Sequence, residues 1–316
     1  MTPLVSIIIP VYNGETYIAE AVESALVQDY PSKEVIVVND GSTDGTMEVL
    51  RQFGGSIRVV DQANGGPPRA RNAGLAAARG EYVAFLDADD VWLQGKLAAQ
   101  VAHMEGHPDV GTCYITWTVW PADADGVFRR PPAAQQPLGA TQVNTAMSGW
   151  IYSRLLFDSE LLTSTVLIRT SVLRRVGEFD QALWNGDDYD FWLRLSQAAQ
   201  ISRLEPAGVL YRVVQGSVSR RARPVNDELV VIERTLARFG LQDPGGPPID
   251  AARVKRRLDG LIFQFGYSHL RQGDPSIAWK SFAQNLRFRP WQPRLWLHAL
   301  RALIKTLRHN RPAPRA

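Results

Sequence analysis

The stretch VSIIIPVYNGETYIAEAVESALVQDYPSKEVIVVND (residues 5–40) decides the fold that the sequence predicts. Its first nine residues form a short, β-branched apolar run, which is typical of a strand covered on both faces. Residues 14–28 follow with helical spacing, and residues 33–40 form a second buried strand. The side chains expected on one face of the helix are Tyr17, Ile18, Ala21, Val22, Ala25 and Leu26. This order predicts a parallel strand pair joined by a right-handed crossover.

The same alternation continues along the chain. We expect a second helix at 41–53 with Ser42 or Thr43 as its N-cap, then a strand at 56–63, a helix at 67–80 and a strand at 81–89. The sequence therefore predicts an α/β fold with a mostly parallel sheet and flanking helices. Ligands of such sheets bind beyond the carboxyl ends of the strands. Asn13, Asp40 and Asp87 lie at these ends, so they should converge on one crevice.

The pattern is less regular beyond the first 90 residues. We expect an exposed loop at 120–140, a strand and short helix at 162–183, a helix with an acidic first turn at 186–200, and a strand with a basic, Ser-rich loop at 207–221. The rest of the chain has a helical pattern. The sequence therefore predicts an α/β domain over residues 1–222 and a helical C-terminal region over residues 223–316.

Three carboxylates, Asp87, Asp89 and Asp90, follow the buried run in YVAFLDADDVW (82–92). Carboxylates that lie so near one another repel and raise each other's pKa values unless a positive charge lies between them. A hard divalent cation, Mg²⁺ or Mn²⁺, takes carboxylate oxygens and retains water and substrate phosphates. We therefore expect a metal here, with Asp90 as an alternative cap for a helix over 91–100.

Composition narrows the class of protein. Cys113 is the only cysteine among 316 residues, which excludes an internal disulfide and suits a reducing compartment. The five histidines form no ligand-spaced cluster with it, so zinc is not expected. The N-terminus lacks the features of a signal peptide, and no run approaches the roughly 18 apolar residues of a membrane span. We expect a cytoplasmic protein.

Four motifs occur together: SIIIPVYNGETYIAEAVESAL, EVIVVNDGSTDGT, NGGPPRARNAGLAAARGEYVAFLDADD and GDDYDFWLRL. This combination resembles the family 2 glycosyltransferases, inverting enzymes of the GT-A fold, over about residues 4–220. The resemblance implies that residues 1–222 form a catalytic domain. It also implies a nucleotide-diphospho-sugar donor, bound by side chains that include Pro10, Tyr12 and Asn13.

Two of the implied nucleotide-binding residues also fit that role chemically. The Asp40 carboxylate can accept a hydrogen bond from a nucleobase N–H, and the planar Arg71 guanidinium suits a base edge or a phosphate. The alternatives are that Asp40 caps the following turn and that Arg71 is a surface helix residue. By resemblance, Asp89 coordinates the metal, and Asp87 contacts the donor's ribose or the metal shell.

The family usually has Glu-Asp where this chain has Asp187 and Asp188. The second residue deprotonates the acceptor in the family, so the resemblance makes Asp188 the base and puts Asp187 in the Glu position. An adjacent carboxylate should raise the pKa of Asp188 toward the range useful for a base. The alternative is that both acids serve only the helix dipole, and Asp190 is expected to be structural.

Further side chains are expected near the substrates. Trp184 is the better candidate to stack on the acceptor sugar, Trp150 is a weaker one, and Trp192 is expected in the core. Ser219 and Arg220, with nearby Ser217, are placed to cover the diphosphate, because arginine pairs well with phosphate.

The C-terminal region is strongly basic: residues 251–316 hold 14 Lys/Arg against two acids, a net charge of +12. One helical hairpin is expected from tetratricopeptide-like spacing of Phe265, Gly266, Ala278, Phe282 and Pro290. In the last helix, one face holds Arg294, His298, Arg301, Lys305 and Arg308, and the other holds Trp296, Leu300, Leu303 and Leu307. This helix suits an anionic membrane surface, or else its apolar face packs on the catalytic domain. Nucleic acid is disfavoured, because the aromatics Trp279, Trp291 and Trp296 have helical spacing rather than a sheet platform.

We therefore expect an inverting, metal-dependent transferase of a UDP-hexose to a glycan, lipid-linked or protein acceptor. A membrane-seeking tail would place it at the inner face of the cell membrane. One alternative is a non-catalytic nucleotide-sugar-binding scaffold. A sugar-nucleotide pyrophosphorylase is less favoured, because PVYNGETY supplies no basic, Gly-rich phosphate loop.

Overall fold

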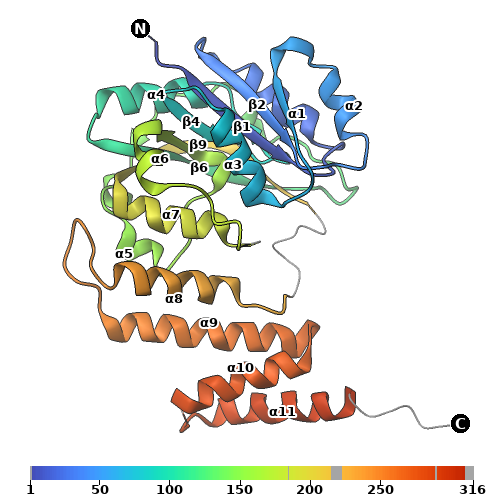
Figure 1. Ribbon diagram of the computed structural model, residues 1–316, viewed down its shortest axis with the longest axis vertical. Helices are drawn as coiled ribbons and strands as arrows, with labels where there is room; N and C mark the ends of the chain where they lie inside the picture. The colour runs from blue at the N-terminus through green and yellow to red at the C-terminus, as the bar shows by residue number, and fades with distance from the viewer. Residues whose placement is uncertain (1, 184, 215–222, 289, 310–316) are drawn as a thin grey trace, which may run out of the picture. The chain divides into compact units, whose positions relative to one another are not determined.

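A computed structural model of the chain describes residues 2–183, 185–214, 223–288 and 290–309. In these ranges nine strands form one sheet in the order β3-β2-β1-β4-β8-β6-β9-β5, with β7 paired to β9 (Figure 1). The strands are β1 (Val5–Val11), β2 (Lys33–Asn39), β3 (Arg58–Asp61), β4 (Tyr82–Phe85), β5 (Val91–Trp92), β6 (Val110–Pro121), β7 (Gln142–Val143), β8 (Val166–Arg169) and β9 (Gln200–Val213).

The expected α/β fold is confirmed, and its first half is the parallel sheet that the sequence predicts. Strands β3, β2, β1 and β4 all pair in parallel, so that their carboxyl ends lie along one edge. The second half is mixed: β8 runs antiparallel to β4 and β6, whereas β6 and β9 are parallel. Long connections through the middle of the chain permit this change of direction.

Helices cover both faces of the sheet. Ile7 and Ile9 of β1 share a buried cluster with α1 and α4, and the intervening Ile8 faces Gly74 of α3. This unit contains α1 (Ile18–Leu26), α2 (Thr46–Arg51), α3 (Pro67–Ala77), α4 (Lys96–Gly106), α5 (Tyr152–Leu155), α6 (Thr170–Val176) and α7 (Asp187–Ala198). Short 3₁₀ turns are η1 (Gly54–Ser56), η2 (Pro132–Gln135), η3 (Thr145–Met147) and η4 (Thr163–Thr165).

Two helix starts differ from the sequence prediction. Helix α1 begins at Ile18 rather than at residue 14, because Gly14 donates its N–H to Thr46 Oγ1 and turns the chain before the helix. Neither Ser42 nor Thr43 caps α2, whose N-cap is Gly45. Asp44 instead accepts the Thr46 N–H at 3.1 Å.

The expected helix over 91–100 is also shorter. Val91 and Trp92 pair with Leu210 and Val209 as β5, and α4 begins only at Lys96 after Gly95 in the left-handed region. Asp90 therefore caps no helix, and that alternative is wrong. Pairing with a strand more than 100 residues away overrides the local helical spacing.

The segment at 120–140 is not wholly an exposed loop. Strand β6 extends to Pro121, and Trp120 and Ala134 are buried in a small apolar cluster with Val91, Leu93 and Leu210. Phe128 packs against this cluster, which ties the Pro-rich segment to the sheet.

The chain divides into two compact units. Unit 1 comprises Met1–Gln215 and Asp243–Pro247, and unit 2 comprises Gly216–Gln242 and Pro248–Ala316. Unit 2 is helical, as expected, with α8 (Asp227–Phe239), α9 (Ala251–Gln272), α10 (Pro275–Phe288) and α11 (Pro293–His309).

Close packing of α9 on α10 forms the hairpin that the repeat-like spacing predicts. A Cβ at Gly266 would lie 2.9 Å from the Ser281 Cβ, so the glycine permits the close approach. Ala278 and Phe282 are fully buried in the cluster that also holds Leu295 of α11. In the described part of the chain, no helix is both long and apolar enough to cross a bilayer.

Candidate active site

The parallel half of the sheet places polar residues along the carboxyl edge of its strands. Residues 12–15 follow β1, Asp40 follows β2, and the acidic turn 87–90 follows β4. Arg71 of α3 contacts this turn at Asp87, and Asp187 at the start of α7 contacts Arg71. The expected placement of Asn13, Asp40 and Asp87 along one edge of the sheet is therefore present, and their convergence on a crevice remains a prediction.

Asp40 is buried and holds the loop that leads into α3. Oδ1 accepts hydrogen bonds from Gln62 Nε2 at 2.7 Å and from Gly65 N at 2.9 Å, and Oδ2 accepts from Gly66 N at 2.8 Å. The turn-capping role left open by the sequence is thus present. A carboxylate oxygen has two acceptor sites, so Oδ2 retains one for a ligand donor. The nucleobase contact of Asp40 remains a prediction.

Asn13 joins the loops that follow β1 and β2. Its backbone is in the left-handed region, with φ of 50°, and its N–H donates to Ser42 Oγ at 2.9 Å. Its Oδ1 accepts the Thr43 N–H at 2.8 Å. Tyr12 beside it is exposed, and Pro10 lies within β1. These residues lie in or just after β1, and their nucleotide contacts remain predictions.

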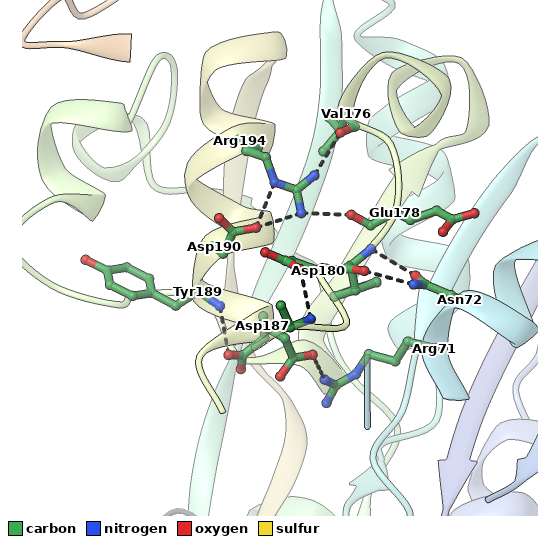
Figure 2. Close-up of polar contacts among 12 residues, drawn as sticks. Arg71, Asn72, Val176, Glu178, Asp180, Asp187, Tyr189, Asp190 and Arg194 are labelled. Atoms are coloured by element: carbon green, nitrogen blue, oxygen red, sulfur yellow. Dashed lines mark hydrogen bonds and ion pairs between the residues drawn. The ribbon is translucent and has the colours of Figure 1, made fainter. Parts of the chain in front are cut away.

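Arg71 bridges the two acidic segments. Nη1 lies 2.6 Å from Asp187 Oδ2, and Nη2 lies 3.2 Å from Asp87 Oδ1. Figure 2 shows Arg71 pointing at Asp187. Burial alone would lower the pKa of Arg71, but Asp187 and Asp87 raise it above its ordinary value. Arg71 is therefore a buried cation rather than a surface helix residue.

Further contacts fix the segment before α7 against α3 and against α7 itself (Figure 2). Asn72 donates from Nδ2 to the Phe179 carbonyl at 2.9 Å and accepts the Phe179 N–H at 2.9 Å. Arg194 pairs with Asp190 and donates to the carbonyls of Val176 and Glu178. Asp190 thus has the structural role expected of it, and the start of α7 is held against α3 and the segment that precedes it.

Asp187 and Asp188 begin α7 after Gly186, whose φ is 79°. Asp187 is 4% exposed. Burial raises the pKa of Asp187 to about 6, even though Arg71 opposes the shift. Asp188 is half-buried and accepts the Tyr189 N–H at 2.7 Å, so it is the more accessible carboxylate of the two.

Hydrogen bonds with Ser164 hold the turn that carries Asp89. Ser164 accepts the Asp87 N–H at 3.0 Å and donates to Asp90 Oδ2 at 2.5 Å. Burial and the charge of Asp87 raise the pKa of Asp89 to about 6. Burial and the charges of Asp87 and Asp89 raise the pKa of Asp90 well above its usual range. Asp90 is therefore structural.

Sequence reasoning missed Ser164 as a support of this turn, and it also missed Arg212 of β9. Its Nε donates to the Asp89 carbonyl at 2.8 Å, its N–H donates to Asp90 Oδ1 at 3.1 Å, and its guanidinium pairs with Glu20. The guanidinium lies 4.2 Å from the Trp120 ring centroid and stacks near two other rings, those of Tyr17 and Phe128. An arginine in the apolar run GVLYRVV was the available signal.

The residues at the turn fit a hard divalent cation. In the described ranges no group of three acidic, His or Cys side chains is arranged to hold a metal. Asp87 and Asp89 lie together on this turn, and burial, with a smaller contribution from the charge of Asp87, raises the pKa of Asp89. Two carboxylates suit Mg²⁺ or Mn²⁺, since these ions keep several waters and bind substrate phosphates.

The remaining expected site residues have mixed outcomes. Trp184, Ser217, Ser219 and Arg220 lie outside the described residues. Trp192 is fully buried in the core, as expected, beside Phe179 and Phe191. Trp150 is half-buried and lies against Gly245.

Comparison with known proteins gives the family. The sequence model described as Glycosyl transferase family 2 matches residues 6–134. WfaP of Escherichia coli, named UDP-Glc:alpha-D-GlcNAc-diphosphoundecaprenol beta-1,3-glucosyltransferase, is 32% identical, over 68% of this chain and 80% of that protein. EpsJ of Bacillus subtilis, an uncharacterized glycosyltransferase, is 30% identical over 72% of this chain and 67% of its own length. Five Rickettsia relatives are 31–33% identical, and the chain spans only 28–61% of their lengths.

Solved structures share the fold. S. aureus TarS (residues 1–349) aligns with a TM-score of 0.63 and 21% identity, covering 96% of this chain and 89% of that chain. A structure of the same TarS fragment holds UDP-GlcNAc. The mannosyltransferase PcManGT of Pyrobaculum calidifontis, in complex with GDP-Man and Mn²⁺, aligns with a TM-score of 0.58 and 21% identity, covering 98% of this chain and 89% of that chain. The motifs, the GT-A fold and the relatives agree: this chain belongs to glycosyl transferase family 2.

Proposed function

We propose that the chain is an inverting, metal-dependent glycosyltransferase that moves a hexose from a UDP-sugar to an acceptor hydroxyl. The observation that carries the proposal is the arrangement of Asp188, Asp187, Arg71 and the acidic turn. An accessible carboxylate lies next to an Asp–Arg–Asp bridge that leads to a candidate metal pair. A general base beside a site for a diphosphate leaving group is what a direct sugar transfer requires.

Asp188 is the proposed base. It accepts the proton of the acceptor hydroxyl, and the acceptor oxygen forms a bond to the anomeric carbon on the face opposite the diphosphate. The bond between that carbon and the diphosphate oxygen breaks, and the nucleoside diphosphate leaves with the bonding electrons. One displacement inverts the configuration, and no covalent enzyme intermediate forms.

The neighbouring groups position the base and the donor. Asp187 is held by Arg71 at 2.6 Å, which fixes the first turn of α7 and hence the backbone of Asp188. Asp87 and Asp89 would hold the metal, and Asp40 would accept a nucleobase N–H. Mg²⁺ or Mn²⁺ bound to this pair supplies positive charge that stabilises the departing diphosphate.

The relatives support a choice of donor and setting. WfaP is named for UDP-Glc and a diphosphoundecaprenol-linked GlcNAc, and UDP-GlcNAc is bound to TarS. We infer that UDP is the nucleotide here, and that the acceptor is a glycan, a lipid-linked sugar or a glycosylated protein. A lipid-linked acceptor would suit peripheral association of the basic C-terminal helices with an anionic membrane surface.

The base assignment is tested by Asp188→Asn, with Asp109→Asn at an exposed site of unit 1 as the matched control. Turnover of UDP-glucose and UDP-GlcNAc, with water as the acceptor, should fall by about 10²–10⁴-fold in Asp188→Asn. UDP affinity should remain within about threefold of the unsubstituted chain. Turnover that survives in Asp188→Asn at the level of the control removes Asp188 from the role of base.

A further inference from the structure

A groove within unit 2 lies between α9 and α11. Its volume is about 440 Å³. Three cationic side chains line it, Arg271 from α9 and Arg301 and Lys305 from α11, together with Tyr267 and His298. Leu270 and Ile304 complete the lining, so no carboxylate lines the groove.

The three cations of the groove have no acidic partner among the residues that the structure describes. In the described ranges, none of Arg271, Arg301 and Lys305 forms an ion pair with an acidic side chain. The Lys305 ammonium donates to the Leu270 carbonyl at 2.9 Å, and Arg271 lies 6.0 Å from the Tyr267 ring centroid. Concentrated positive charge of this kind, with planar guanidinium donors, suits a phosphate group.

His298 provides a second polar feature of the groove. Its Nδ1 is buried and has no hydrogen-bond partner within the described residues. Burial, with a smaller contribution from Arg301, lowers the pKa of His298 below its usual value. The ring is therefore neutral near pH 7.

An exposed apolar stripe on α11 borders the groove. We define it as Trp296, Leu300, Ile304 and Leu307, which are spaced three, four and seven residues apart and so share one helix face. Trp296 is 54% exposed, Leu300 55% and Leu307 60%. Ile304 belongs both to the stripe and to the groove lining. The opposite side of α11, with Leu295, Ala299 and Ala302, is buried in unit 2.

We propose that the groove binds the phosphate headgroup of an anionic phospholipid, while the stripe on α11 lies in the apolar edge of the bilayer. This rests on the membrane association proposed above and assigns its headgroup site. A free phosphate would need the cations but not the stripe. A nucleic acid would likewise make no use of exposed leucines. A second copy of this chain would bring together two regions that each carry a net charge of +12 over residues 251–316, whereas an anionic bilayer neutralises that charge.

The test is co-sedimentation of the full chain with vesicles of phosphatidylcholine alone or mixed with phosphatidylglycerol. The groove variant is Arg271→Gln, Arg301→Gln and Lys305→Gln. The control is Arg253→Gln, Lys255→Gln and Arg256→Gln, which removes the same charge near the start of α9, roughly 20 Å along the helix. Affinity for phosphatidylglycerol vesicles should fall by about 100-fold in the groove variant and by less than about tenfold in the control. Equal losses in both variants would mean diffuse attraction and would overturn the groove site.

A second variant, Leu300→Gln with Leu307→Gln, tests the stripe. We expect vesicle binding to fall at least about tenfold, because two leucines that the bilayer would bury are lost. The melting temperature should not change. A lower melting temperature would show that the chain itself covers the stripe and would overturn the proposal. Velocity sedimentation checks for dimers. If the unsubstituted chain forms dimers and this variant does not, the stripe binds a second copy of the chain and the lipid proposal is overturned.

Two controls separate the remaining outcomes. Inorganic phosphate and glycerol 3-phosphate are titrated by calorimetry; tight binding of either, with no binding to vesicles, would assign the groove to a soluble phosphate and overturn the lipid proposal. UDP binding is measured on every variant. Vesicle binding that is retained by the groove variant but lost by the stripe variant rejects the headgroup site and leaves membrane association standing, whatever the outcome for UDP.

Discussion

Arg71 of α3 and Asp187 of α7, which are 116 residues apart in the sequence, form a buried ion pair that joins the two helices. The Arg71 Nη1 lies 2.6 Å from the Asp187 Oδ2. The other guanidinium nitrogen reaches Asp87 at 3.2 Å. One positive charge thus faces two negative charges, one on the acidic turn after β4 and the other at the start of α7. Arg71 is the residue that links Asp87 of the candidate metal pair to α7, the helix that carries the proposed base.

Removal of Arg71 should expose this coupling. Arg71→Met leaves the buried Asp187 and the half-buried Asp87 without a cation and should lower the free energy of unfolding by about 3–5 kcal/mol. Adding Asp187→Asn should restore part of that loss, with a coupling energy above about 1 kcal/mol in a double-mutant cycle measured by urea denaturation. Arg79→Met, which removes an exposed partner of Glu34, should cost less than about 1 kcal/mol. Additive effects of Arg71→Met and Asp187→Asn would contradict the bridge.

Arg212 should act as a positioning residue for Asp89. Arg212→Lys keeps a positive charge near Glu20 but loses the Nε–H bond to the Asp89 carbonyl, so the turn should loosen. We expect the Mn²⁺ concentration that half-saturates UDP binding to rise about tenfold. Arg130→Lys is the matched control, because Arg130 also pairs with Glu20, and it should leave the Mn²⁺ requirement unchanged. A lower stability of Arg212→Lys with an unchanged Mn²⁺ requirement would limit Arg212 to a structural role.

Lys96 should make the stability of unit 1 depend on pH. It is fully buried, and its Nζ lies 3.6 Å from the Trp92 ring centroid with no hydrogen-bond partner among the described residues. Burial lowers the pKa of Lys96 from 10.5 to about 7. The unfolded chain therefore binds this proton more tightly, so the group's cost to folding is greatest below pH 7 and disappears as the pH rises toward 10.5.

The substitution Lys96→Met removes that cost. We expect it to raise the free energy of unfolding by on the order of 2–4 kcal/mol at pH 7, after allowance for the lost contact with Trp92, and by less than about 1 kcal/mol at pH 10. Urea denaturation at both pH values measures the difference. If Lys96→Met is less stable than the unsubstituted chain at pH 7, the folded state favours the charged form of Lys96, contrary to this prediction.

Local periodicity in the sequence was enough to predict the first half of the fold. The buried runs at β1, β2 and β4 have no polar alternation because helices cover both faces of the sheet, and the motif residues follow their carboxyl ends along one edge. The errors arose where distant segments decide the local structure. Residues 91–92 form a strand because β9 pairs with them, and α1 starts late because Thr46 binds the turn before it.

The candidate site was predictable by residue type but not by contact. The sequence indicated Arg71, Asp87 and Asp187, yet gave no reason to expect one guanidinium between the two carboxylates, because that requires α3 and α7 to meet in space. Arg212 was missed for the same reason. Its contact with Asp89 spans 123 residues, and only the fold brings the two together.

The central claim is a metal-dependent UDP-sugar site, and calorimetric titration of the full chain with UDP, with and without Mn²⁺, tests it most directly. GDP serves as the comparison nucleotide, and Asp89→Asn and Asp188→Asn serve as the variants. We predict UDP binding that requires Mn²⁺, weakens at least about tenfold in Asp89→Asn and is retained in Asp188→Asn. UDP that fails to bind, or that binds equally well without Mn²⁺ and in Asp89→Asn, would contradict the account.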